Sequence, residues 1–437
     1  MPDIKKPKNI VLLTIDCLRT DRLAYSGNLN KITPFLDSIA KKSVVFHNCY
    51  TPSSATSSSM CSYLTSKYPF EHGSRFTGDK LNFKDHTSFV ELLQEQYHTV
   101  GFSSVENLNK YFNYDAGFNE YFDHIKYYSQ FRNFGFNRKY NLLNFLRKLG
   151  IKNNHYITGS SLNAKIRRWF KFNSSDKLLL WSHFFDLHTW SKLLPKDSEK
   201  LYNSDSWADK VVEIYNNHLN KTDYFIEDFF SILSSNIDMD ETLIIISADH
   251  GEMLGEHDSY MHGITLYDQE MNIPLIFYYP KYLDSIEVHD NISTIDIAPT
   301  ILDICGLDIS DSFSGLSFKN ILHGKKEKSR FCYMESSYTD KYALKLNDYK
   351  FIYNGTNYIK MPRKIIRGNE LYNLKEDKTE SINIIDKKIK VAKKLENLLF
   401  KILKVEDSLK VPSKLLLDET VDELIKLGYL KKEYNEK

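Results

Sequence analysis

Three side chains that could bind a metal ion stand just after apolar stretches of the chain. Asp16 follows the run from Ile10 to Ile15, and Asp249 and His250 follow the run from Thr242 to Ser247. Carboxylate oxygen combined with imidazole nitrogen suits Zn²⁺ or Mn²⁺ better than Ca²⁺, which prefers ligands that are all oxygen. These residues therefore predict a divalent metal site, with Zn²⁺ or Mn²⁺ favoured over Ca²⁺.

The apolar stretches also predict the elements that would position these residues. Four runs have the length and composition of buried strands, at 10–15, 177–185, 242–247 and 274–279. Residues 33–40 have the pattern of a helix with proline at its first position. Strands that alternate with helices indicate an α/β fold, a mostly parallel sheet sandwiched by helices. Ligands of such sheets bind beyond the carboxyl ends of the strands, so Asp16, His188 and Asp249 should share one edge.

Composition and charge indicate a globular protein without a nucleic-acid partner. Among 437 residues, 42% are hydrophobic, and 58 Lys and Arg balance 57 Asp and Glu to a net charge of +1. Such a balance argues against nucleic-acid binding through bulk charge. No apolar run approaches the ~18 residues of a transmembrane helix, and none near the start resembles a signal peptide. We therefore expect a cytoplasmic protein with no transmembrane segment, and a composition rich in Leu, Lys, Ile and Asn suggests a bacterial source.

Two changes of composition suggest the domain organisation. The segment at about 125–175 holds eleven Lys and Arg, no Asp or Glu, and many aromatic residues. It is either a solvated basic surface or a rim that attracts an anionic substrate. From about residue 329 short alternating strands appear, followed by a Lys-rich helical tail from about Asp386. We expect a catalytic domain at 1–325 with the basic insertion, and a smaller C-terminal α+β domain at 326–437.

Sequence blocks spread over nearly the whole chain form an ordered pattern. The most specific is Ser247–His257 followed by His262–Glu270, and the others are Asn9–Asp21, Thr33–Ala40, Phe46–Thr51, Leu64–Gly73, Trp181–His188, Ile273–Ile276, Asp296–Gly306, Glu370–Leu374 and Leu427–Leu430. Together, over about residues 8 to 430, they resemble the sulfatase family of the alkaline phosphatase superfamily. The resemblance implies the alkaline phosphatase/sulfatase-like fold and an enzyme that acts on esters with a divalent metal.

The resemblance also implies roles for residues at matching positions. Asp16, Asp249 and His250 fall on metal-ligand positions. His262 falls where many sulfatases have a lysine that contacts the transferred anion, and His188 falls on a histidine that holds sulfate or phosphate oxygens. These roles are physically consistent, because a tetrahedral anion at a metal needs cationic or N–H donors around it.

The nucleophile position departs from the family pattern. Counting back from Leu64 and Thr65 places it at Thr56, which would serve as both nucleophile and metal ligand. Sulfatases carry Cys or Ser there, followed by x-Pro-x-Arg, for conversion to formylglycine. Thr56 is instead followed by Ser-Ser-Ser-Met at 57–60. In the superfamily, a threonine at this position is typical of phosphodiesterases and phosphotransferases.

A second departure is Cys17, which stands where sulfatases often have a further aspartate ligand. Losing an oxygen ligand while keeping His250 moves the site away from Ca²⁺ and toward Zn²⁺ or Mn²⁺. Cys17 itself is either a thiolate ligand or a small buried residue, and the buried role is favoured. A second metal is a further option, with Asp186, His188 and His262 as its ligands.

We therefore expect a metal-dependent hydrolase or transferase that acts on phosphate or sulfate esters through Thr56. Phosphoester hydrolysis or phosphotransfer is the main interpretation, with His262 or His257 protonating the leaving oxygen. The alternatives are a sulfatase that works without formylglycine and a non-catalytic member that binds an anion. The basic segment suggests an anionic small molecule, glycan or lipid-linked sugar as substrate, and the sequence does not predict the oligomeric state.

Overall fold

An eight-stranded sheet forms the centre of the protein in a computed structural model, which describes residues 4–76, 79, 86–123, 156–193, 205–358 and 368–408. The strand order is β11-β2-β10-β7-β1-β6-β4-β5. The bounds are β1 Asn9–Ile15, β2 Val44–Phe46, β4 His98–Ser103, β5 Glu120–Phe122, β6 Leu178–Phe184, β7 Thr242–Ala248, β10 Leu275–Tyr278 and β11 Ile286–Val288. All neighbours run parallel except β10, which is antiparallel to both β7 and β2.

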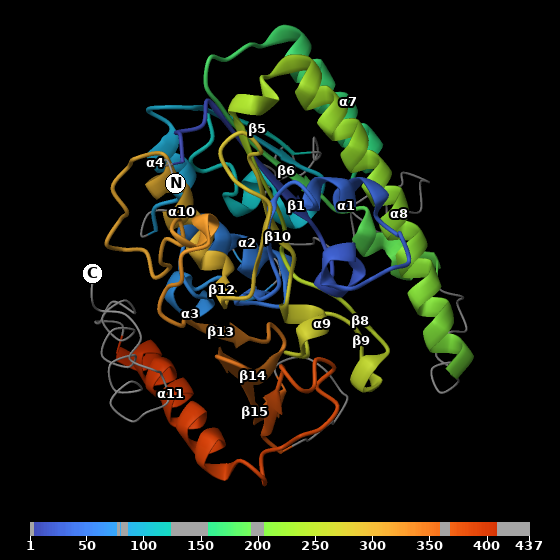
Figure 1. The fold of residues 1–437 in the computed structure, drawn as a ribbon, viewed down its shortest axis with the longest axis vertical. Helices are drawn as coiled ribbons and strands as arrows, with labels where there is room; N and C mark the ends of the chain where they lie inside the picture. The colour runs from blue at the N-terminus through green and yellow to red at the C-terminus, as the bar shows by residue number, and fades with distance from the viewer. Residues whose placement is uncertain are drawn as a thin grey trace, which may run out of the picture.

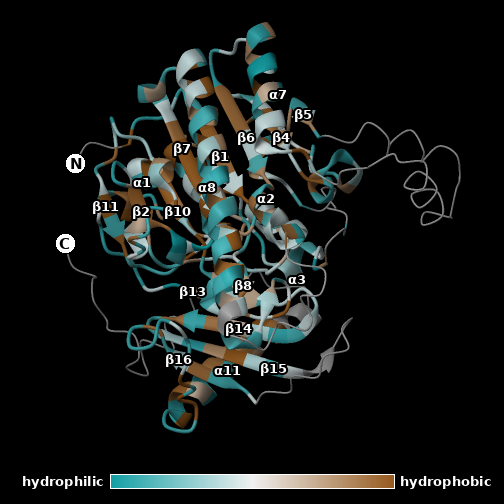
Figure 2. Cartoon of the chain, turned by 90° about the vertical axis from the view of Figure 1, so that its right-hand side faces the viewer, coloured by the Kyte–Doolittle hydropathy of each residue, from teal (hydrophilic) through white to brown (hydrophobic). Residues whose placement is uncertain are grey.

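The central strands are buried on both faces, as a parallel sheet covered by helices requires. Every residue of β1, β6 and β7 is buried, and these strands coincide with the apolar runs that predicted them. Figure 2 shows the same contrast, with hydrophobic strands inside and more hydrophilic helices outside. Burial of these β-branched and leucine side chains is the main favourable contribution to folding in this region.

Helices cover both faces of the sheet (Figure 1). On one face α8 (Asp205–Asn236) packs against α1 (Pro34–Ala40) and α7 (Gly159–Phe172). On the other face α10 (Ile297–Ile304) packs against α2 (Thr56–Thr65) and α4 (Phe89–Leu93). The predicted α/β sandwich with a mostly parallel sheet is therefore confirmed, and the reversed strand β10 is an addition to it.

A second sheet lies beside the first, at the bottom of Figure 1. It is fully antiparallel, in the order β13-β14-β15-β16, and α11 (Ile389–Ser408) packs on it. Its strands are β13 Phe331–Glu335, β14 Thr339–Leu346, β15 Tyr349–Tyr358 and β16 Glu370–Asn373. The α+β character expected for the C-terminal part is thus observed, whereas the boundary near residue 325 stays a prediction. Residues 124–155 of the basic segment, and the match at 427–430, lie outside the described residues.

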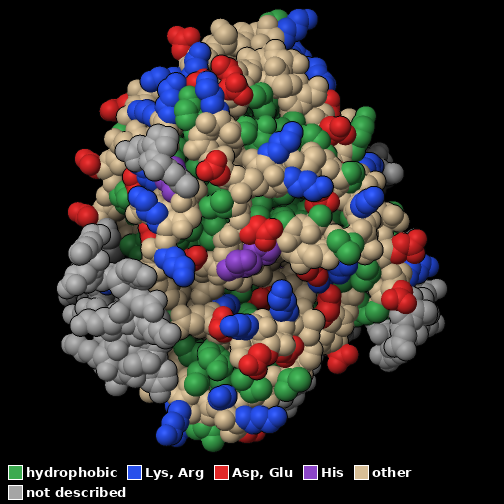
Figure 3. Space-filling model, viewed as in Figure 1, with side chains coloured by type: hydrophobic (Ala, Val, Ile, Leu, Met, Phe, Trp, Pro, Cys, Tyr) green, Lys and Arg blue, Asp and Glu red, His purple; other side chains and the backbone are tan. Residues whose placement is uncertain are grey.

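Shorter elements complete the described part of the chain. They include the paired strands β3 (Cys49–Tyr50) with β12 (Ile292–Ser293) and β8 (Met253–Leu254) with β9 (Tyr260–Met261), and the helices α3 (Pro69–His72) and α9 (Asp268–Met271). All five cysteines are buried and free. Within the described ranges, no helix has both the length and the apolar character needed to cross a bilayer. On the face shown in Figure 3, basic and acidic side chains are interspersed, in keeping with the balanced net charge.

Candidate active site

The ends of two neighbouring strands place two carboxylates side by side. In the parallel register Ile15 of β1 pairs with Ala248 of β7, so Asp16 and Asp249 leave the sheet next to each other. The backbone N–H of Asp16 continues the ladder by donating to the carbonyl of Phe184 at 2.9 Å. Both carboxylates are fully buried. Two buried carboxylates this close need a cation or protons to offset their charge.

The donor atoms around these carboxylates fit a divalent cation. Ligand atoms of Asp16, Asp249 and His250 lie within 4.8 Å of one another. Oδ1 of Asp249 accepts from the backbone N–H of His250 at 2.8 Å, whereas its buried Oδ2 has no hydrogen-bond partner. Burial, followed by the charge of Asp16, raises the pKa of Asp249 above its usual range. An orphaned carboxylate oxygen facing a second carboxylate is the arrangement expected of a cation site.

His250 is oriented for ligation by its own backbone. Its Nδ1–H donates to the carbonyl of Gly251 at 2.9 Å, which leaves Nε2 free to bind a metal. A side chain on Gly251 would collide with the backbone oxygen of Gln269, so glycine is required there. The Asp-His-Gly sequence therefore sets the geometry of one ligand as well as providing it.

Thr56 is the first residue of α2 and faces the same group. Its Oγ1 lies 3.3 Å from Oδ2 of Asp16 and 3.3 Å from Nε2 of His250, and the residue is 5% exposed. The N-terminus of a helix favours negative charge, both on an alkoxide at Thr56 and on an anion beside it. Ser59, one turn later, donates to the carbonyl of Asp249 at 2.6 Å and ties the helix to β7. The structure thus brings together the four predicted residues Asp16, Thr56, Asp249 and His250.

Glu252, a residue that the sequence analysis did not single out, stabilises the protonated, positively charged form of His262. Nδ1 of His262 bonds Oε1 of the fully buried Glu252 at 3.0 Å, and Nε1 of Trp190 donates to Oε2 of Glu252 at 2.8 Å. Burial lowers the pKa of His262, but the charge and hydrogen bond of Glu252 outweigh it and raise the pKa to about 9. His262 is therefore an imidazolium at neutral pH, with the charge of the lysine that the family resemblance places there.

His188 lies beside His262, but Asp186 does not join them. The rings of His188 and His262 meet edge to face with centroids 5.0 Å apart, and His188 also stacks on Phe185 at 4.3 Å. Oδ2 of Asp186 instead accepts from the backbone N–H of Gly159 at 2.7 Å. Asp186 belongs to none of the groups of possible metal ligands found in the described part of the chain. The expected ligand set of Asp186, His188 and His262 is therefore not formed.

His257 is oriented away from this group. Its ring stacks on Tyr267 with centroids 3.7 Å apart, and its Nε2 donates to the carbonyl of Thr379 at 3.1 Å. Of the two histidines considered for protonating the leaving group, His262 contacts Glu252, His188 and His250 of the site.

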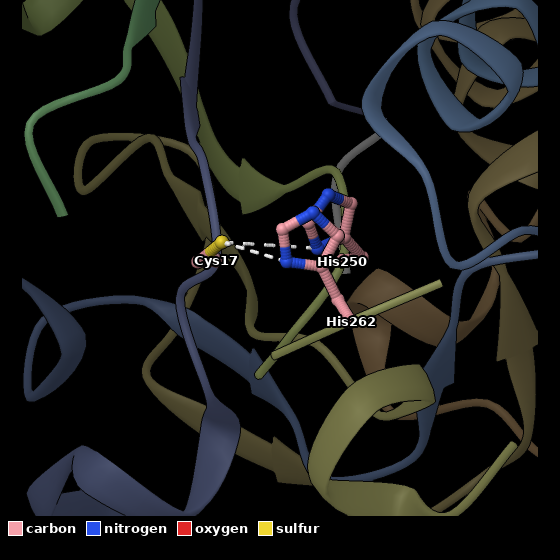
Figure 4. A group of neighbouring side chains, drawn as sticks. All are labelled: Cys17, His250 and His262. Carbon is pink, nitrogen blue, oxygen red and sulfur yellow. Dashed lines mark hydrogen bonds between the residues drawn. The ribbon is translucent and has the colours of Figure 1, made fainter. Parts of the chain in front are cut away.

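Cys17 lies inside the site, although the sequence favoured a small buried residue over a metal ligand at this position. Its Sγ donates to Oδ1 of Asp16 at 3.0 Å and lies 3.7 Å from Nδ1 of His262 and 3.9 Å from Nδ1 of His250 (Figure 4). His183 of β6 also lies here, a residue for which the sequence favoured a packed strand histidine over a ligand. Its Nε2 lies 3.5 Å from Oδ2 of Asp16 and is buried without a hydrogen-bond partner.

Comparison with known proteins gives two family matches. Residues 8–307 match the family described as Sulfatase, and residues 255–406 match the family described as N-sulphoglucosamine sulphohydrolase, C-terminal. An N-acetylglucosamine-6-O-sulfatase of Bacteroides thetaiotaomicron is 24% identical, with 91% of this chain and 86% of that protein covered. These matches favour the sulfatase alternative over the phosphoester interpretation.

Solved structures share the fold at low sequence identity. A protein in complex with its substrate D-glucosamine-2-N,6-O-disulfate gives a TM-score of 0.68 at 19% identity, covering 94% of this chain and all of the other. A phosphonate monoester hydrolase of Agrobacterium radiobacter gives a TM-score of 0.66 at 17% identity, covering 92% of this chain and 96% of the other. Enzymes acting on sulfur and on phosphorus esters therefore have the same architecture as this chain.

Proposed function

The chain belongs to the sulfatase family of ester hydrolases, and on that premise we propose that it hydrolyses sulfate esters of an anionic glycan with Thr56 as the nucleophile. The observation that carries the proposal is the convergence of Thr56 Oγ1 on Asp16 and His250, at 3.3 Å from each. Two similar proteins support a glycan substrate. One is named as an N-acetylglucosamine-6-O-sulfatase, and the other was solved in complex with a disulfated glucosamine. The imidazolium of His262 supplies the positive charge that a sulfate group needs.

Asp16, Asp249 and His250 would hold a divalent cation, with Thr56 beside it. When bound, such a cation supplies Lewis-acid chemistry, lowering the pKa of a coordinated hydroxyl and polarising the ester. The hydroxyl of Thr56 can pass its proton to Oδ2 of Asp16, 3.3 Å away, because the cation would occupy Nε2 of His250. The resulting alkoxide attacks sulfur in line with the leaving oxygen.

His262 contributes charge and a proton to the same site, where its ring centroid lies 4.2 Å from that of His250. As an imidazolium it pairs with sulfate oxygens and can donate its proton to the leaving sugar oxygen. Glu252 keeps its ring in place and keeps it charged. Water then attacks the sulfur of the sulfated threonine and restores the hydroxyl of Thr56.

The test uses the full chain, stripped of metal and reloaded separately with Zn²⁺, Mn²⁺ and Ca²⁺. We would measure release of sulfate from glucosamine 6-sulfate and N-sulfoglucosamine, beside aryl sulfate, in wild type and Thr56→Ala. Loss of the nucleophile should lower kcat by about 10⁴-fold or more. Thr65→Ala is the matched control, since Thr65 ends the same helix and its hydroxyl donates to the carbonyl of Cys61 at 2.8 Å. Sulfate release that survives in Thr56→Ala would exclude Thr56 as nucleophile.

Phosphoester hydrolysis is the second candidate, and two observations favour it. Thr56 lacks the formylglycine signature, and the phosphonate monoester hydrolase shares the fold. Aryl phosphate and aryl phosphodiester belong in the same assay for this reason. Turnover of either without sulfate release would establish this candidate. If cation binds and no ester is turned over, the chain is an anion-binding member of the fold.

A further inference from the structure

A second group of ligand atoms lies next to the first and shares one residue with it. Asp16, Cys17 and His188 each offer one ligand atom, and these atoms lie within 4.8 Å of one another. The two oxygens of Asp16 face different partners. Oδ2 faces Oγ1 of Thr56, whereas Oδ1 accepts from Sγ of Cys17 at 3.0 Å. Asp16 can therefore serve two cation positions at once.

We propose that Asp16, Cys17 and His188 hold a second, thiophilic cation such as Zn²⁺. The inference rests on the proposed function in one respect, because Asp16 also belongs to the first cation position. Thiolate and imidazole ligands suit Zn²⁺, whereas Ca²⁺ requires an oxygen shell. As the bond from Sγ of Cys17 to the metal forms, the S–H bond breaks and its proton leaves to solvent.

The backbone fixes Cys17 in a conformation that few residues adopt. Its φ is +61°, in the left-handed region that costs a non-glycine residue free energy. Two hydrogen bonds hold it there, since its N–H donates to Oδ1 of Asp249 at 3.3 Å and Tyr215 donates to its carbonyl at 2.7 Å. The side chain is thereby directed at Asp16, His188 and His262. A residue needed only to fill space would not require this strained backbone.

His188 has its ring nitrogens available for a cation. The ring is held by its contacts with Phe185 and His262, and no hydrogen bond to either nitrogen is found within the described ranges. The other group that contains Cys17 is less suited to an ion. There Nδ1 of His250 already donates to the carbonyl of Gly251, and Nδ1 of His262 is hydrogen-bonded to Glu252.

Buried atoms without partners mark the first cation position, which the proposed second position adjoins. Oδ2 of Asp249 and Nε2 of His183 are both buried and unpartnered. They lie at the first position, where Nε2 of His183 is 3.5 Å from Oδ2 of Asp16. With that position occupied through Oδ2, the Oδ1 atom of Asp16 is left to Cys17 alone. Charge on Oδ1 then favours a cation over the weak S–H donor now in contact with it.

The experiment is a cobalt titration of the metal-stripped full-length chain, followed by absorption spectroscopy. Co²⁺ replaces Zn²⁺ in thiolate sites, and a sulfur-to-cobalt charge-transfer band reports the Co–S bond directly. All variants carry His289→Asn, because His47, Glu287 and His289 form a separate group on the surface that could bind cobalt. Cys17→Ser is the test variant. Cys305→Ser is the control, since Cys305 is also buried but bonds Tyr97 at the end of α10.

We expect about two cobalt ions per chain, with the charge-transfer band rising only with the second. Cys17→Ser should lose the band and weaken the second binding step by at least about 100-fold, while Cys305→Ser should match the parent. Excess Ca²⁺ should displace the first cobalt more readily than the second. One tightly bound cobalt with no band, unchanged by Cys17→Ser, would overturn this inference and leave the proposed function standing. No tightly bound cobalt at all would overturn both.

Discussion

Replacing Glu252 by glutamine tests whether His262 provides the positive charge that the site offers an anion. Glutamine keeps the size of the side chain and can still accept the hydrogen bond from Trp190, but it removes the charge beside His262. The charge and hydrogen bond of Glu252 raise the pKa of His262 from 6.5 to about 9 against the opposing effect of burial. Without Glu252 that pKa should fall to 6.5 or below.

The expected size of the effect depends strongly on pH. At pH 8 a pKa of about 9 leaves His262 about 90% protonated, whereas a pKa of 6.5 leaves it about 3% protonated. If only the imidazolium supports catalysis, kcat/KM at pH 8 should fall by about 30-fold in Glu252→Gln. At pH 6 both proteins are mostly protonated, and the difference should stay below about twofold.

The assay is a profile of kcat/KM against pH from about 5.5 to 9.5, with a sulfate ester and one equivalent of cation per chain. Asp223→Asn is the matched control, since Asp223 is another buried carboxylate, but it accepts from the backbone N–H groups of Phe35 and Leu36. This control should lose stability and keep the wild-type profile. An equal loss of activity in Glu252→Gln at pH 6 and pH 8 would refute the reasoning. Such a loss would be independent of the protonation of His262 and would indicate a structural defect instead.

Three further predictions concern stability and metal binding. The pKa of His262 is raised in the folded state, so protonated His262 stabilises the metal-free protein by about 3 kcal/mol below pH 6.5. This stabilisation should be lost as the pH rises through about 9. Urea unfolding at several pH values would measure the loss. Asp249→Asn should abolish the rise in Tm that saturating cation gives wild type, about 2.7 kcal/mol of stabilisation at a concentration 100 times Kd. Lys350→Met should cost about 3–5 kcal/mol, because buried Lys350 pairs with Asp268 at 2.7 Å and Glu380 at 2.9 Å and its loss leaves both carboxylates unpaired. A cost below 1 kcal/mol in urea unfolding would contradict that last assignment.

The strand-end residues were predictable from the sequence because their placement follows from local structure. Asp16, Asp249 and His250 each come directly after a buried parallel strand, and the sheet register alone brings them together. Thr56 was placed through the family resemblance, by counting back from Leu64 and Thr65, and it begins the helix that carries all three. In these cases the chain leaves a regular element at the residue in question, so no loop conformation has to be known.

The residues that the sequence could not resolve depend on loop geometry. Glu252 and His262 lie on either side of the β8–β9 hairpin, and nothing in their spacing predicts that they pair. Asp186 and His188 are two positions apart, yet a 3-10 turn begins at Leu187, and the two side chains contact different parts of the protein. The reversal of β10 was also hidden, because an apolar run has the same composition in either direction.

Charge balance connects the two cation positions to the kind of anion that the site would accept. With one cation bound, Asp16 and Asp249 offset its charge and Glu252 offsets His262, so the site is close to neutral. A second cation with Cys17 as thiolate adds one positive charge, which matches the single negative charge of a sulfate monoester. A phosphate monoester carries close to two negative charges at neutral pH, so the same added charge attracts it more strongly.

We therefore expect the second cation to raise kcat/KM for an aryl phosphate monoester more than for an aryl sulfate. Titrating wild type with Zn²⁺ from one to two equivalents, with both substrates assayed in parallel, would measure this ratio. Cys17→Ser should show no such change, because it lacks the thiolate that retains the second ion. A larger gain for the aryl sulfate would mean that the charge of the second cation does not set the preference of this site, and that the geometry around Thr56 does.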